Sequence, residues 1–92
     1  MSNIIKELHG DYRIQDNDYI LVYNGPEDIS PYVYLPSATG SKSVYIVRNL
    51  IDVDLVVCAE APDTIEGETS FTVVQYETVV LLDFKTGLWI KI

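Results

Sequence analysis

Hydrophobic residues occur along this 92-residue chain in short runs, and turn-forming residues separate the runs roughly every 8–12 positions. The runs are rich in Val, Ile, Leu, Tyr and Thr, whereas the intervening segments are rich in Gly, Pro, Ser, Asn and Asp. β-Branched and aromatic runs bounded by such turns predict strands. The expected strands are residues 19–23, 32–35, 43–48, 54–59, 71–74, 78–82 and 88–92. We therefore expect an all-β domain, a small antiparallel β-sandwich or jelly-roll-like β-barrel of about seven strands.

Most of these expected strands are apolar on both faces. Val79, Val80, Leu81 and Leu82 follow one another without a polar residue. Because successive side chains of a strand point to opposite faces, a strand with one face in water should alternate apolar with polar residues. We assign one face to the core, with Ile20, Val22, Val44, Ile46, Leu55, Val57, Val79 and Leu81. We expect the other face to contact further copies of the chain, through Tyr19, Tyr23, Tyr45, Val80 and Leu82.

The first fifteen residues lack this strand rhythm, so we expect residues 1–15 to be an extended arm and residues 16–92 to be the domain. An extended arm is favoured over a helical turn at residues 2–9. The arm carries Ile4, Ile5 and Leu8, which would be exposed unless a partner surface covered them. These three side chains are therefore expected to anchor the chain to a neighbouring molecule.

The charge balance bears on possible partners. Fourteen acidic residues outnumber six basic ones, the net charge is −8, and the sequence pI is about 4.2. The basic residues are scattered singly, whereas binding to a phosphate backbone needs clustered Lys and Arg. Neither a nucleic acid nor an anionic membrane is expected as a partner. A single cysteine, Cys58, permits no internal disulfide, and the chain has no signal-peptide pattern, so we expect synthesis in the cytoplasm.

Candidate catalytic and ligand-binding residues are few. His9 is the only histidine and has no nearby His or Cys with metal-ligand spacing. Cys58 lies in an apolar run, which favours an inert packing thiol over a nucleophile. The paired acidic residues, such as Asp16 and Asp18, lack the pattern of a calcium-binding loop. We predict no catalytic, cofactor or metal site, and no enzymatic activity.

Several short motifs follow one another in a recognisable order: DYI at 18–20, VYLP at 33–36, TIEG at 64–67, QYETV at 75–79 and GLWI at 87–90. Their order and spacing resemble a small β-rich domain common in virion proteins of tailed phages, namely tail fibres, head fibres and capsid decoration (cement) proteins. The resemblance covers residues 16–92. It implies a non-enzymatic, usually trimeric structural module, in which Pro36 ends a strand and Gly67 adopts a positive φ in a turn.

Within this group we expect a trimeric capsid decoration protein on the outer shell of a virion, with the phage major capsid protein or another virion protein as partner. The domain stands alone in this chain, whereas fibres join it to long shafts, and the acidity suits a surface away from packaged DNA. Phe84 departs from the resemblance and is a candidate contact residue. The alternatives are a head-fibre base or tail-fibre module, or a non-viral β-module that binds sugars through Trp89 and the tyrosines.

Overall fold

A computed structural model of the chain describes residues 5–92, and this part is all-β, without a helix. The prediction of an all-β fold is confirmed. The strands are β1 (Ile5–Leu8), β2 (Tyr12–Arg13), β3 (Ile20–Tyr23), β4 (Tyr32–Tyr34), β5 (Val44–Asn49), β6 (Leu55–Cys58), β7 (Thr64–Ile65), β8 (Ser70–Val73), β9 (Thr78–Lys85) and β10 (Leu88–Lys91).

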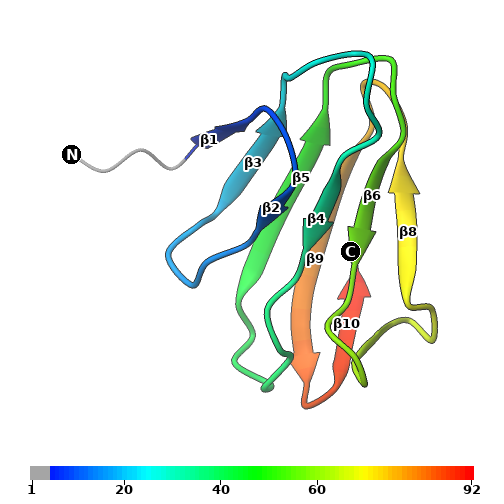
Figure 1. Cartoon of the computed structure of the whole chain (residues 1–92). Coiled ribbons are helices and arrows are strands. Elements are labelled where there is room, and N and C mark those ends of the chain that lie inside the picture. The colour runs from blue at the N-terminus through cyan, green and yellow to red at the C-terminus, as the bar shows by residue number, and fades with distance from the viewer. Residues whose placement is uncertain (1–4) are drawn as a thin grey trace.

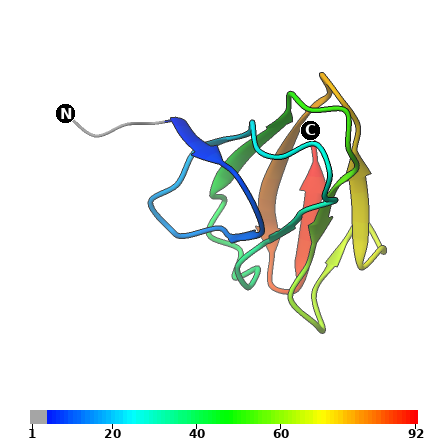
Figure 2. The same ribbon diagram turned by 45° about the horizontal axis from the view of Figure 1, so that its top comes forward.

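The strands form two sheets that lie over one another (Figure 1 and Figure 2). The six-stranded sheet has the order β1-β3-β5-β9-β10-β7, and the four-stranded sheet has the order β2-β4-β6-β8. Over the first six strands the chain therefore changes sheet after every strand. Within each sheet, successive strands of this part are parallel: β1 with β3, β3 with β5, β2 with β4, and β4 with β6. This stacking is that of a short β-solenoid.

The later strands close the unit with reversed direction. Strand β8 is antiparallel to β6, β9 is antiparallel to β5, and β10 is antiparallel to β9. The prediction of an antiparallel sandwich or jelly roll is thus wrong for the first six strands. In the first six strands each return to a sheet restores the original direction of the chain, whereas β8 and β9 return to their sheets in the opposite direction. Strand direction is set by the path of the connections, which the residues of a strand do not reveal.

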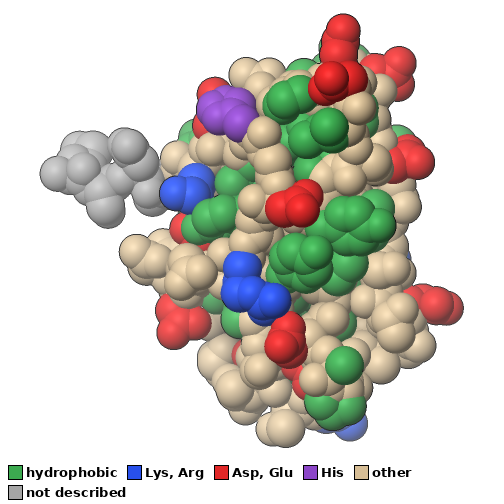
Figure 3. All heavy atoms as spheres, viewed as in Figure 1, with side chains coloured by type: hydrophobic (Ala, Val, Ile, Leu, Met, Phe, Trp, Pro, Cys, Tyr) green, Lys and Arg blue, Asp and Glu red, His purple; other side chains and the backbone are tan. Residues whose placement is uncertain are grey.

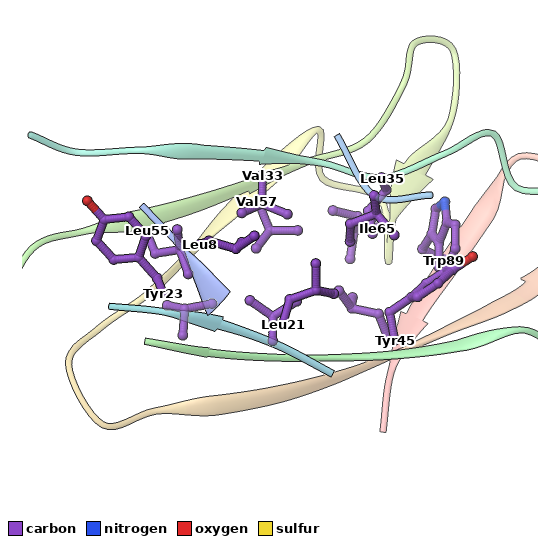
Figure 4. Close-up of a cluster of buried hydrophobic side chains, with 14 of the residues drawn as sticks. Leu8, Leu21, Tyr23, Val33, Leu35, Tyr45, Leu55, Val57, Ile65 and Trp89 are labelled. Carbon is purple, nitrogen blue, oxygen red and sulfur yellow. The ribbon is translucent and has the colours of Figure 1, made fainter. Parts of the chain in front are cut away.

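The core lies between the two sheets, where side chains from both meet (Figure 4). Leu55, Val57 and Leu81 are fully buried there, as predicted. Val79 is half-buried and packs against this core. The full set of buried hydrophobic residues is Leu8, Ile14, Leu21, Tyr23, Val33, Leu35, Ala38, Tyr45, Val47, Leu55, Val57, Ile65, Val73, Leu81 and Trp89.

In β3 and β5 the predicted faces are reversed. Leu21, Tyr23, Tyr45 and Val47 point into the core. The residues predicted for the core, Ile20, Val22, Val44 and Ile46, are only partly buried and lie on the outward side of the sheet. Both faces of these strands are apolar, so alternation alone does not say which one is covered.

The residues predicted as an arm belong instead to both sheets. Strand β1 pairs with β3 from Ile5↔Ile20 to Leu8↔Tyr23, and β2 pairs with β4. Leu8 and Ile14 are 3% and 2% exposed. For residues 5–14 the expectation of an arm outside the fold is therefore wrong, because the parallel ladder and these two buried side chains make them part of the unit. Ile4, also assigned to the arm, lies outside the described residues.

A hydrogen bond to a carboxylate also ties this segment to the rest of the fold. The Tyr12 hydroxyl donates to Asp18 Oδ2 at 2.6 Å. Burial, this hydrogen bond and the Asp18 charge raise the pKa of Tyr12 to about 12. The phenol therefore stays protonated and able to donate at neutral pH.

The buried Asn49 organises the apolar segment that follows β5. Its Nδ2 donates to the carbonyl oxygens of Val53 and Val73, at 2.7 and 2.9 Å, and its Oδ1 accepts from the Ile51 amide at 2.9 Å. Ile51 and Val53 pack against the core from this loop. The apolar residues in a segment where a polar turn would be expected thus have a structural role.

Candidate functional site

The outward side of the six-stranded sheet carries a continuous set of aliphatic side chains, which we call the aliphatic face. The register places Ile20 beside Ile46, Ile46 beside Val80, and Val44 beside Leu82. Leu82 in turn lies beside Ile90. The face is made of Ile20, Val22, Val44, Ile46, Val80, Leu82 and Ile90, all partly exposed.

The aliphatic face is neutral over its centre. Arg48 lies beside Thr78 at one end and donates to the Thr78 hydroxyl at 2.7 Å. At the other end, Lys42 lies 4.8 Å from the centre of the exposed Phe84 ring. Four strands about 4.8 Å apart, with two side chains on this face of most strands, give an apolar area on the order of 300 Å². Apolar patches of this size are often interaction sites.

The outward side of the four-stranded sheet has a different chemistry, and we call it the tyrosine face. It consists of Arg13, Tyr32, Tyr34, Val56 and Cys58. The rings of Tyr32 and Tyr34 are stacked, with their centroids 6.2 Å apart and their planes at 18°. Arg13 lies 5.2 Å from the centre of the Tyr34 ring and pairs with Glu60 at 3.0 Å. Figure 3 shows this side of the molecule, where apolar side chains gather in the middle and acidic side chains lie around them.

Some of the predicted contact residues lie at the surface, and others are buried in the core. Val80 and Leu82 lie on the aliphatic face, and Phe84 is exposed at its end. Ile5 and Tyr19 are exposed close to the β1–β3 side of the same sheet.

Three residues predicted for contacts are instead core residues. Leu8, Tyr23 and Tyr45 are 3%, 0% and 2% exposed. The Tyr23 hydroxyl donates to the Pro26 carbonyl at 2.7 Å, so its polar end has a partner next to the core. The assignment of these three to the outer surface was wrong because it followed the reversed faces of β3 and β5 and the arm.

Sequence reasoning also missed residues of both faces. Ile20, Val22, Val44 and Ile46 were assigned to the core, and Ile90 was not singled out. Tyr32 and Tyr34 were not chosen either, although the Tyr-x-Tyr spacing places two rings on one side of a strand. That spacing was the available signal for the tyrosine face.

A polar cavity of about 350 Å³ opens at the end of the unit beside residues 36–43. Tyr45 and Trp89 lie against it, with ring centroids 5.8 Å apart, but Trp89 is completely buried. The Trp89 indole N–H donates to the Pro36 carbonyl at 3.2 Å. The face of the indole is therefore not open for stacking on a sugar in this chain.

The carboxylate of Asp83, also at this cavity, accepts hydrogen bonds from the loop on both of its oxygens. Asp83 Oδ1 accepts from the Gly40 amide at 2.8 Å, and Oδ2 accepts from the Thr39 amide at 3.0 Å and the Ser41 hydroxyl at 2.8 Å. Burial alone would raise the pKa of Asp83, but these donors outweigh it and lower the pKa below its ordinary value. Asp83 thus anchors the loop.

The remaining chemical candidates are placed apart. The exposed His9 lies 3.3 Å from Glu7, and burial raises the pKa of the Cys58 thiol, which makes its thiolate less accessible at neutral pH. In residues 5–92 no three His, Cys, Asp or Glu side chains gather as metal ligands would. No helix of this described part is long and apolar enough to cross a membrane.

Most of the basic side chains lie over aromatic rings rather than together. The pairs are Lys6 with Tyr12, Arg13 with Tyr34, Lys42 with Phe84, and Lys91 with Phe71, at 4.8–5.2 Å. Four of the six basic residues are therefore distributed over separate rings, and they form no stripe that could follow a phosphate backbone.

Protein-family models, curated protein sequences and solved structures gave no significant match to this chain. The comparisons therefore assign it neither a family nor a function.

Proposed function

We propose that this protein is a non-enzymatic structural protein of a bacteriophage virion, specifically a trimeric capsid decoration (cement) protein on the outer shell. The observation that carries the proposal is the aliphatic face, a neutral apolar surface on a chain with a net charge of −8. The order of sequence motifs supports the virion assignment, because it resembles domains of tail fibres, head fibres and decoration proteins.

The occupant of the aliphatic face is another copy of the same chain. Two highly acidic copies repel one another wherever their charges meet, but the centre of this face has no charge to repel. Burying the rest of seven side chains that are already largely covered gains about 0.5–1 kcal/mol each, a third of the usual value for full burial. Association itself costs roughly 4–15 kcal/mol, so one face alone gives a marginal pair. A closed trimer on a capsid lattice adds further contacts with the major capsid protein.

The test is a charge placed at the centre of the aliphatic face. Ile46→Asp should convert a trimer to a monomer, measured by light scattering and sedimentation velocity at micromolar concentration. Val56→Asp is the matched control, since Val56 is equally half-buried on a central strand but on the opposite sheet. Circular dichroism verifies that both variants fold. A wild-type chain that stays monomeric both in solution and on shells would refute the proposed assembly.

The virion assignment needs a separate measurement. Co-sedimentation with emptied phage heads and with isolated tails distinguishes a decoration protein from a tail module, and binding to neither contradicts the proposal. A head-fibre base would bind each head at only a few sites. A decoration protein would bind each head in many copies, one set at every equivalent position of the capsid lattice. The sugar-binding alternative has less support, because Trp89 is buried and the Asp83 carboxylate is already hydrogen-bonded.

A further inference from the structure

We infer that the tyrosine face binds an arginine-bearing, extended segment of a different protein, with an incoming guanidinium lying over the Tyr32 ring. This inference does not rest on the proposed self-association, since the tyrosine face belongs to the four-stranded sheet and the aliphatic face to the six-stranded sheet, and the two sheets lie over one another (Figure 1). It concerns a second surface with its own partner.

The protein already contains one example of the proposed contact. The Arg13 guanidinium lies 5.2 Å from the centre of the Tyr34 ring, and Glu60 holds it at 3.0 Å. A guanidinium in this position stacks on the aromatic ring through a cation–π contact and forms an ion pair with the carboxylate at its edge. The tyrosine face is thus able to hold arginine in this geometry.

Tyr32 also combines an aromatic ring with a nearby carboxylate, but none of the cation–π pairs described above involves its ring. Its ring is nearly parallel to that of Tyr34, and the residue is 43% exposed. The Tyr32 amide donates to Asp11 Oδ1 at 2.8 Å, which fixes that carboxylate beside the strand. Asp54 is exposed and lies two residues before Val56, the register partner of Tyr32, so it belongs to the same side of the sheet. The Asp11 carboxylate therefore lies at the Tyr32 backbone, and Asp54 adds a second exposed carboxylate at the start of the neighbouring strand.

The charges also decide the kind of partner. A second copy of this chain would bring its own Asp11, Asp54 and Glu60 against the same groups, and its only cation on this face, Arg13, is already paired with Glu60. Like charges placed together oppose association. A basic segment complements the acidic surround and supplies the cation that Tyr32 lacks. The partner is accordingly a positively charged protein segment, and an extended one would place alternate side chains on the tyrosine face.

The experiment uses the full chain and two peptides of equal charge, one of four Gly-Arg repeats and one of four Gly-Lys repeats. Affinities are measured by isothermal titration calorimetry at 50 and 150 mM NaCl. We expect the arginine peptide to bind more tightly than the lysine peptide at both salt concentrations. Tyr32→Leu should weaken arginine-peptide binding about two- to fivefold, the effect of one exposed cation–π contact, and Tyr32→Phe should retain it.

The matched control is Tyr76→Leu, which removes a tyrosine that is 64% exposed outside the tyrosine face and should leave the affinity unchanged. NMR shift mapping with the wild-type chain gives a second readout that does not depend on any variant folding. The amides of Tyr32 and Val56 should move with the arginine peptide and those of the aliphatic face should not. Equal binding of both peptides, equal effects of the two leucine variants, or shifts spread over all acidic surfaces would overturn the inference.

Discussion

Replacing Asp83 with asparagine should destabilise the protein by about 2–4 kcal/mol at pH 7, although the two side chains have the same shape. The Asp83 carboxylate accepts the Gly40 amide on one oxygen, and the Thr39 amide and Ser41 hydroxyl on the other. Asparagine retains only one acceptor oxygen, and its amide nitrogen then faces a donor. A hydrogen bond to a charged group contributes about 1.5–3 kcal/mol, and a buried donor left without a partner costs about 1–3 kcal/mol.

The stability loss caused by this substitution should depend on pH. The pKa of Asp83 is lower in the folded protein than in the unfolded chain, where it is about 3.9, so the ionised carboxylate stabilises the fold above that pH. This stabilisation is lost as the pH falls through the lowered pKa of the folded state. The stability difference between wild type and Asp83→Asn should therefore be full at pH 6–7 and should shrink below about pH 4.

Urea unfolding followed by tryptophan fluorescence measures both effects, since Trp89 is the only tryptophan and is buried beside this loop. Asp16→Asn is the control, because Asp16 is exposed at the same cavity, and its effect should stay within about 0.5 kcal/mol. A loss below about 0.5 kcal/mol for Asp83→Asn, or a difference that persists unchanged to pH 2, would refute the loop-anchor role.

Four further substitutions test the fold, each by urea unfolding. Leu81→Ala should cost about 2–5 kcal/mol because Leu81 is fully buried. Leu82→Ala, on the outward face, should cost less than half as much when measured on the monomer, and equal losses would contradict the assigned faces. Leu8→Ala should also cost about 2–5 kcal/mol, and a negligible loss would show that β1 is not part of the stable unit. Gly25→Ala should cost about 1–3 kcal/mol, since the added Cβ would lie 2.6 Å from His9 Cα; unchanged stability would argue against this close approach.

Local features of the fold were predictable because they depend on neighbouring residues. The turn at TIEG was expected to place Gly67 at a positive φ, and the observed φ is 91°. The expected strand over residues 78–82 appears within β9, and that over 88–92 contains β10. The apolar outer surface was also expected, with Val80 and Leu82 on it.

The candidate interfaces were less predictable, since their residues come together through strand pairing. Ile20, Ile46 and Val80 are neighbours only because β3, β5 and β9 are adjacent in one sheet. The anchoring of the loop by Asp83 joins residues more than forty positions apart, and no local pattern distinguishes this carboxylate from the other acids.

The sequence by itself determined an all-β chain of short strands, apolar on both sides, with singly scattered basic residues. These properties follow from side-chain chemistry and a two-residue period, both of which are local. Only the tertiary structure decided which side of β3 and β5 is buried, since shifting such a strand by one residue exchanges two equally apolar faces. It also decided that the first six strands run parallel within their sheets, because strand direction depends on where each connection leads and not on the strand's own residues.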